Sequence, residues 1–223
     1  FVASRLPGGR APQTSARGSL LHELGAGLSM IARTPVLRSN YLVSTGMGVF
    51  FGGFLLVLIP LAVRDLYNGS AQDIASGYVM FAAGTMLSIA WLTQRGGLRR
   101  PGRALVMTQF TACAALLPIS LDVPLGWFYL CIFSWGLSLG VGMTMSRTIM
   151  QEQAPASHQS RIMAALTLMT TGGGPLGAFM TGQAIAAVGV KGAVLLPIVG
   201  VLACTAASLA THSMIGLSSR SHA

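Results

Sequence analysis

The sequence WFYLCIFSWGLSLGVGMTMSRTIM at residues 127–150 continues as QEQAPASHQSR at 151–161 and IMAALTLMTTGGGPLGAFMTG at 162–182. The two outer runs are apolar and contain no acid, and roughly 18 or more apolar residues are enough to cross a bilayer as a helix. Their glycines would weaken a helix in water, whereas in lipid they let neighbouring helices approach closely. We therefore predict two transmembrane helices built for close packing. The glycines concerned are Gly136, Gly140, Gly142, Gly172, Gly173, Gly174, Gly177 and Gly182.

The composition of the whole chain extends this interpretation. Of 223 residues, 52% are hydrophobic and only 9% are charged, whereas about a quarter of the residues in a soluble domain are charged. The formal net charge is +9, but the basic residues fall in the connections between apolar runs. That distribution is typical of membrane topology and argues against nucleic acid as a partner.

The chain offers no pattern for a metal, a cofactor or a catalytic centre. Cys113, Cys131 and Cys204 lie inside apolar runs and form no Cys-x-x-Cys or Cys/His spacing, so we predict buried packing groups. The glycine-rich run TTGGGPLG at 170–177 lacks the lysine and the preceding strand of a phosphate-binding loop. Ser138 and His212 differ in expected depth by roughly 10 Å, too far for an intramembrane serine protease.

Hydropathy divides the chain into four parts. We predict a disordered cytoplasmic linker at 1–19, an amphipathic interfacial helix at 20–38, a six-helix transmembrane domain at 39–214 and a cytoplasmic tail at 215–223. In the second part, Leu20, Leu24, Leu28 and Ile31 recur at helical spacing, and the helix is expected to end near Pro35. The predicted spans are 41–63, 74–93, 104–121, 124–146, 162–188 and 192–211.

The basic residues predict the orientation of these spans. Twelve of the 14 lysines and arginines fall on one side of the predicted bilayer, and the other side holds only Arg64 and Lys191. Since cytoplasmic loops carry the excess of basic residues, both termini of the chain are expected in the cytoplasm. The membrane lipid is then the solvent around an all-α bundle.

Three stretches indicate a family. They are ELGAGLSMIARTPVLRSNY before the first span, SRTIMQEQAPASHQSRIMA between the fourth and fifth spans, and PLGAFMTGQAIAAVG within the fifth. Together they resemble the C-terminal half of major facilitator superfamily carriers. The last stretch is similar to the branch of enterobactin exporters and macrolide-efflux carriers. The resemblance implies half of a twelve-helix fold whose first, second, fourth and fifth spans line a cavity. It also implies an N-terminal six-helix half and a small-molecule substrate as partners.

The resemblance and the local sequence together suggest residues for gating. Arg147 is either a residue that reaches cytoplasmic water, paired with Glu152, or a latch that bonds the ends of neighbouring helices. The connection QRGGLRRPGR keeps the basic part of a family motif but lacks its aspartate, and Ser160 stands where a glycine is usual. A kink is expected at Pro175. The candidate gating residues are Arg95, Arg99, Arg147, Glu152, Arg161, Gly173, Gly174 and Pro175.

Sparse polar and aromatic side chains within the spans suggest the substrate pathway. An apolar wall with few hydroxyls suits a bulky amphipathic molecule better than a sugar or an ion. The candidates are Thr45, Phe50, Phe54, Ser88, Ser134, Trp135, Ser138, Thr167 and Thr171. No acid or histidine lies within a predicted span, so a proton-coupling carboxylate is expected in the other half.

We therefore expect a secondary transporter of the bacterial inner membrane that exports amphipathic small molecules, and no enzymatic activity. Because the chain begins at Phe1, we expect it to be part of a longer protein. The alternative is a self-contained six-span protein, either a channel subunit or a membrane assembly factor. Six further apolar spans upstream would favour the carrier, and a start codon just before Phe1 would favour the alternative.

Overall fold

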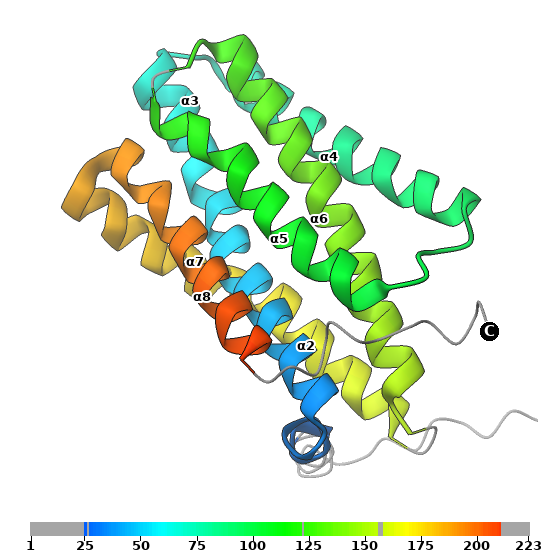
Figure 1. Ribbon diagram of the computed structural model, residues 1–223. Helices are drawn as coiled ribbons and strands as arrows, with labels where there is room; N and C mark the ends of the chain where they lie inside the picture. The colour runs from blue at the N-terminus through cyan, green and yellow to red at the C-terminus, as the bar shows by residue number, and fades with distance from the viewer. Residues whose placement is uncertain (1–24, 26, 122, 156–157, 211–223) are drawn as a thin grey trace, which may run out of the picture.

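The computed structural model describes residues 25, 27–121, 123–155 and 158–210, so the predicted linker at 1–19 and tail at 215–223 lie outside the described residues. Besides the helical residues 27–33, seven helices and no strand occur in the described part, as expected of an all-α protein. Two π-helical segments, η1 and η2, and one 3-10 turn, η3, accompany them (Figure 1). The elements are α2 (Pro35–Gly46), η1 (Met47–Phe51), η2 (Phe54–Leu58), α3 (Ile59–Tyr67), α4 (Ala71–Gln94), α5 (Pro101–Leu116), η3 (Leu117–Leu121), α6 (Leu125–Gln153), α7 (Gln159–Ala193) and α8 (Leu195–Leu209).

Five helices of the described chain are long and apolar enough to cross a membrane, which confirms five of the predicted spans. The first comprises α2, η1, η2 and α3, runs over Pro35–Tyr67 and is called the first span below. The others are α4, α5 with η3, α6 and α7. The predicted sixth span corresponds to α8, a shorter apolar helix of 15 residues. Because α7 continues to Ala193, α8 begins later than the predicted start at Gly192.

The chain before the first span is also helical and is docked onto the bundle. Residues 27–33 form a helix that bends at Thr34, and α2 begins with Pro35, a residue well suited to the first helical turn. Ile31 is buried in a cluster with Leu37 of α2, Met150 of α6 and Ile162 of α7. One face of the predicted interfacial helix therefore packs on protein.

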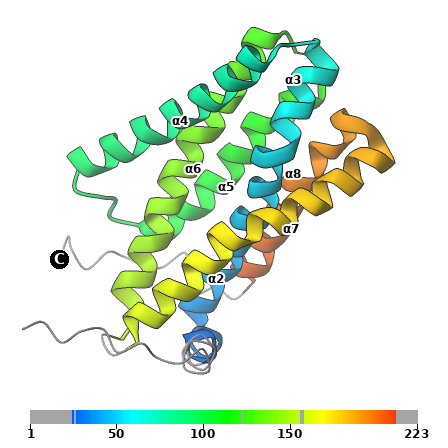
Figure 2. The ribbon, with the colours of Figure 1, turned by 180° about the vertical axis from the view of Figure 1, so that it is seen from behind.

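The helices form a bundle whose connections alternate between its two ends (Figures 1 and 2). The start of α2 and the α4–α5 and α6–α7 connections lie at one end, which carries Arg95, Arg99 and Arg161. The α3–α4, α5–α6 and α7–α8 connections lie at the other. Helices α5 and α8 form the face toward the viewer in Figure 1, and α6 and α7 face the viewer in Figure 2.

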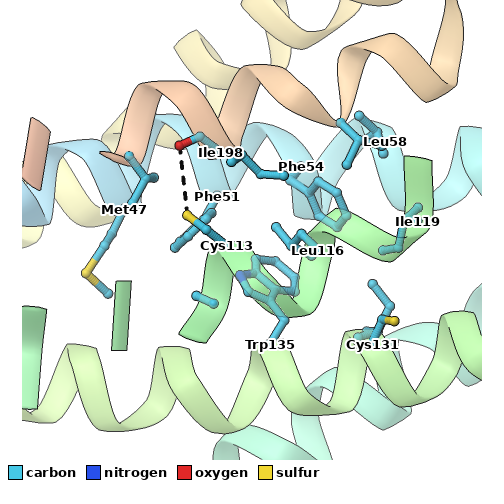
Figure 3. Close-up of a cluster of buried hydrophobic side chains, with 14 of the residues drawn as sticks. Met47, Phe51, Phe54, Leu58, Cys113, Leu116, Ile119, Cys131, Trp135 and Ile198 are labelled. Carbon is cyan, nitrogen blue, oxygen red and sulfur yellow. Dashed lines mark hydrogen bonds between the residues drawn. The ribbon is translucent and has the colours of Figure 1, made fainter. Parts of the chain in front are cut away.

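An aromatic cluster fills the centre of the bundle (Figure 3). Trp135 of α6 is fully buried, and its ring centroid lies 5.6 Å from that of Phe51, 5.0 Å from Phe54 and 4.7 Å from Phe81. Two of these contacts are edge-on, the geometry that aromatic quadrupoles favour. The cluster joins the first span to α4 and α6 and fixes their spacing at mid-depth.

The first span and α7 touch backbone to backbone through three pairs of glycines. Gly48 lies against Gly173, Gly52 against Gly174, and Gly53 against Gly177. A Cβ atom added at Gly52 would lie 2.9 Å from the Gly174 Cα, closer than real Cβ atoms come to backbone. Three of the five glycines predicted within 162–182 thus allow close packing, with the first span as partner, whereas Gly172 meets only Leu168 of its own helix and Gly182 meets no atom within 4 Å. We call the six paired glycines the glycine seam.

The glycines of α6 face other neighbours, because Gly136 and Gly140 lie against the backbone of α4. Helix α7 also differs from the expectation in the position of its kink. Its backbone stays helical through Pro175, and the dihedral angles leave the helical range at Gly189, where φ is 73° and ψ is 173°. The glycine seam on both sides of Pro175 holds this part of α7 against the first span.

Candidate functional site

A largely apolar cavity of about 280 Å³ lies between the first span, α4, α6 and α7. These are the spans to which the family resemblance assigns the cavity wall. The described lining residues are Ser44, Met47, Gly48, Phe51, Gly52, Leu55, Phe81, Leu139, Met143, Ser146, Arg147, Leu166, Thr167 and Thr170. Half of them are aliphatic or aromatic and two are glycines, and an apolar lining with a few polar groups is the usual composition of a small-molecule site.

Each wall of the cavity is one face of one helix. On the first span the lining positions run from Ser44 to Leu55 at spacings of 3, 4, 7, 8 and 11 residues, which place them in a single stripe. On α6, the positions from Leu139 to Arg147 follow the same rule. Both π-helical segments contribute to the first-span stripe. Such segments widen a helix locally and are frequent at functional sites.

Hydroxyls and an amide hold the first span to α6 at one end of the cavity. Ser44 donates its hydroxyl hydrogen to the Asn40 carbonyl oxygen at 2.8 Å, and the Ser44 and Ser146 Oγ atoms are 2.6 Å apart. The Asn40 Nδ2 donates to the Ser146 carbonyl oxygen at 3.0 Å. All three residues are buried, so these hydrogen bonds lie away from bulk water. They fix the position of α6 directly before Arg147.

Arg147 lies at the same end of the cavity and is exposed. Helix α6 continues to Gln153, so Arg147 and Glu152 both lie within the helix rather than in a polar link. Within the described residues Arg147 makes no hydrogen bond and no ion pair, and the expected pair with Glu152 is not formed in this structure. Among the described residues that line the cavity, Arg147 carries the only full charge.

The candidate pathway residues fall in several places. Thr167 lines the cavity, and Thr167 and Thr171 also line an open groove along α7. Thr45 lines a groove between α2 and α8. Phe54 and Trp135 are buried in the aromatic core and do not line the cavity.

The remaining candidates make helix contacts. Phe50 packs against Gly200 of α8. Ser88 is buried and donates to the Thr85 carbonyl oxygen at 2.8 Å. The carbonyl oxygen of Ser134 accepts from the Ser138 hydroxyl at 3.1 Å. Ser138 also lies 2.9 Å from the Thr111 Oγ1, so its hydroxyl is occupied in holding α5 to α6.

Three of the gating candidates lie in the glycine seam or beside it, namely Gly173, Gly174 and Pro175. The Arg95 guanidinium lies 4.6 Å from the ring centroid of Trp91, within cation–π range. Arg99 is exposed in the α4–α5 connection, and Arg161 lies in the first turn of α7 with its backbone against Gly27. The structure therefore brings Arg147 to the cavity and leaves Arg95 and Arg99 in a separate connection.

Sequence reasoning missed most of the first-span stripe, including Ser44, Met47 and Leu55. It selected polar and aromatic residue types and chose the neighbouring positions Thr45, Phe50 and Phe54. The helical spacing of the stripe was available as a signal. It does not identify the cavity face, because every face of a buried membrane helix is apolar.

Nothing in the described residues forms a metal site, since no group of three histidine, cysteine or acidic side chains is close enough to hold an ion. His212, the other member of the rejected Ser–His pair, lies outside the described residues.

The sequence of residues 2–178 matches the family model of the Major Facilitator Superfamily. No curated protein matches the chain, and no solved structure does. The match covers the first span, α4, α5, α6 and the first half of α7, and thus all the described residues that line the cavity.

Proposed function

The chain belongs to the Major Facilitator Superfamily, a family of secondary transporters without enzymatic activity, and we propose that it forms the C-terminal six-helix half of an exporter of amphipathic small molecules. The substrate sits in the cavity between the first span, α4, α6 and α7, and a second six-helix half closes the cavity from the opposite side. We place the protein in the bacterial inner membrane with its basic end in the cytoplasm, and we assign it to the branch of enterobactin and macrolide exporters.

The cavity wall carries this proposal. Phe51, Phe81, Leu139 and Met143 offer apolar surface, and the polar lining residues among those described are hydroxyls and one arginine. A sugar or an inorganic ion needs several polar or charged ligands to replace its hydration shell, because burying a polar group without partners is costly. An amphipathic molecule loses little hydration on entering such a wall and gains dispersion contacts with it.

Transport in this proposal proceeds by alternating access, in which the two halves rock around a central site. Large apolar side chains on the outside of the bundle, such as Met86 at 71% exposed and Met107 at 67%, fit contact with lipid. The described acids in the helices, Asp65, Asp73 and Glu152, lie in terminal turns. We therefore assign proton coupling to a carboxylate in the other half, so amide replacements of these three acids should leave coupling intact.

A transport assay with a filled cavity tests the proposal. The complete gene product is reconstituted into liposomes, and uptake of a fluorescent amphipathic dye is measured in vesicles with the cytoplasmic side outward. Met143→Trp, which places a larger ring in the cavity, should reduce uptake several-fold. The matched control Met107→Trp changes an exposed residue and should transport like the wild type.

Equal uptake by the Met143 and Met107 variants would contradict the assignment of the cavity. Flux that rises linearly with dye concentration, without saturation, would favour the alternative of a channel subunit. Saturable uptake that is reduced only in the cavity variant supports the carrier.

A further inference from the structure

We infer that the ligand of the cavity is an amphipathic anion whose headgroup binds Arg147 and whose apolar body extends toward Phe51, Phe81 and Leu139. This inference rests on the proposed function and adds a charge and an orientation to its substrate. It arises from the way polarity changes along the cavity.

Most of the polar lining residues lie at one end of the cavity. Ser146 and Arg147 are near the end of α6 and Thr167 is near the start of α7, and Ser44 contacts Ser146. Leu166 lies at the same end, and Thr170 is about one turn further along α7. On α6, Leu139 is eight residues from Arg147, about 12 Å along the helix at 1.5 Å per residue. The headgroup of a ligand that spans this length contacts a cation and hydroxyls. The body of the same ligand contacts aromatic rings and aliphatic side chains.

Arg147 has no counterion within the described residues, and no described lining residue is acidic. Basic side chains within or near a membrane usually pair with an acid, a carbonyl oxygen or water. A guanidinium presents a planar fork of donors that matches the two oxygens of a carboxylate, sulfonate or phosphate group. An anionic headgroup supplies the partner that the described chain does not.

The two neighbouring serine hydroxyls do not compete with Arg147 as donors. Ser44 donates to the Asn40 carbonyl oxygen at 2.8 Å, so the short Ser44–Ser146 contact of 2.6 Å uses the Ser146 hydrogen. The Ser44 hydrogen is therefore committed within α2, and the Ser146 hydrogen is committed to the contact between α6 and the first span. Arg147 is the strongest donor left at this end, and the same hydrogen bonds hold the α6 backbone in place beside it.

A matched pair of probes tests the charge of the ligand. Anilinonaphthalene sulfonate and the neutral phenylnaphthylamine share one aromatic skeleton and differ in the sulfonate. Binding of each to the purified full-length protein is followed by energy transfer from tryptophan, after subtraction of protein-free micelles. Trp135 is a suitable donor because its ring lies 5.6 Å from that of Phe51 and 4.7 Å from that of Phe81, both in the cavity wall.

Arg147→Gln should weaken binding of the sulfonate by about tenfold, the lower end of what a charge-assisted hydrogen bond contributes at a site open to water. Binding of the neutral probe should not change. Arg147→Lys keeps the charge but loses the fork and should give an intermediate loss. Arg100→Gln removes an exposed charge from the α4–α5 connection and is the matched control, with no expected change.

The outcomes separate this inference from the proposed function. If the sulfonate binds equally to wild type and Arg147→Gln while both probes bind, the anionic headgroup is refuted and an amphipathic substrate stands. If neither probe binds the wild type, both are refuted. Displacement of the sulfonate by dihexanoyl phosphatidylglycerol, but not by dihexanoyl phosphatidylcholine, supports the anionic headgroup and identifies membrane lipid as its source.

Discussion

Replacing Gly177 by alanine tests how the first span and α7 are held together. The added Cβ would collide with the Val49 carbonyl oxygen and lie 3.0 Å from the Gly53 nitrogen. Since backbone atoms cannot rotate away, the two helices must separate by a distance on the order of 1 Å, and overpacking of this kind costs about 1–3 kcal/mol. The expected loss in the free energy of unfolding is of that size.

Gly182→Ala, on the same helix, is the matched control. A Cβ atom added at Gly182 meets no atom within 4 Å, so this variant should be as stable as the wild type or gain up to about 1 kcal/mol from helix propensity. Both variants are compared by SDS titration of the purified protein in mixed micelles, with helical circular dichroism as the signal. Equal stability of Gly177→Ala and Gly182→Ala would refute the backbone contact.

Three further changes follow from other parts of the structure. Trp135→Ala should lower the free energy of unfolding by about 3–5 kcal/mol, because it empties the aromatic centre; a loss below 1 kcal/mol in the same SDS titration would contradict this. Ser44→Ala and Ser146→Ala should each lower the free energy of unfolding by about 1 kcal/mol. A double-mutant cycle should show non-additive losses, and additive losses would mean that the two hydroxyls do not interact. A membrane-impermeant maleimide applied to intact cells should label Asn68→Cys and spare Arg99→Cys; the reverse labelling would invert the proposed orientation.

The spans were predictable because lipid imposes a strong constraint on sequence. A helix that crosses a bilayer must stay apolar for about 20 residues, and the runs that satisfy this rule correspond to the first span and to α4, α5, α6 and α7. Helix ends were harder to predict. The first span begins at Pro35 rather than near Tyr41, and α6 ends at Gln153 rather than near Ser146, because polar residues extend helices beyond the bilayer boundary at little cost.

The cavity was less predictable than the spans, for a related physical reason. In a soluble helix the apolar stripe identifies the buried face, but in a membrane helix this contrast disappears. Phe50 and Phe51 are adjacent in sequence, yet Phe50 packs on α8 and Phe51 lines the cavity. Arg147 was recognisable from sequence because it is the basic residue that ends the apolar run of the fourth predicted span. Its position in the wall of the cavity could not be predicted from the sequence, because it depends on how four helices pack together.

The glycine seam has a mechanical consequence. Side chains that interdigitate can change rotamer and let two helices slide, whereas main chains in direct contact have no such freedom. We therefore expect the first span and α7 to move as one rigid body whenever the bundle changes conformation. Relative movement of helices should then occur at interfaces that are built from flexible side chains. A cross-link between the first span and α7 should therefore leave the conformational change of transport intact.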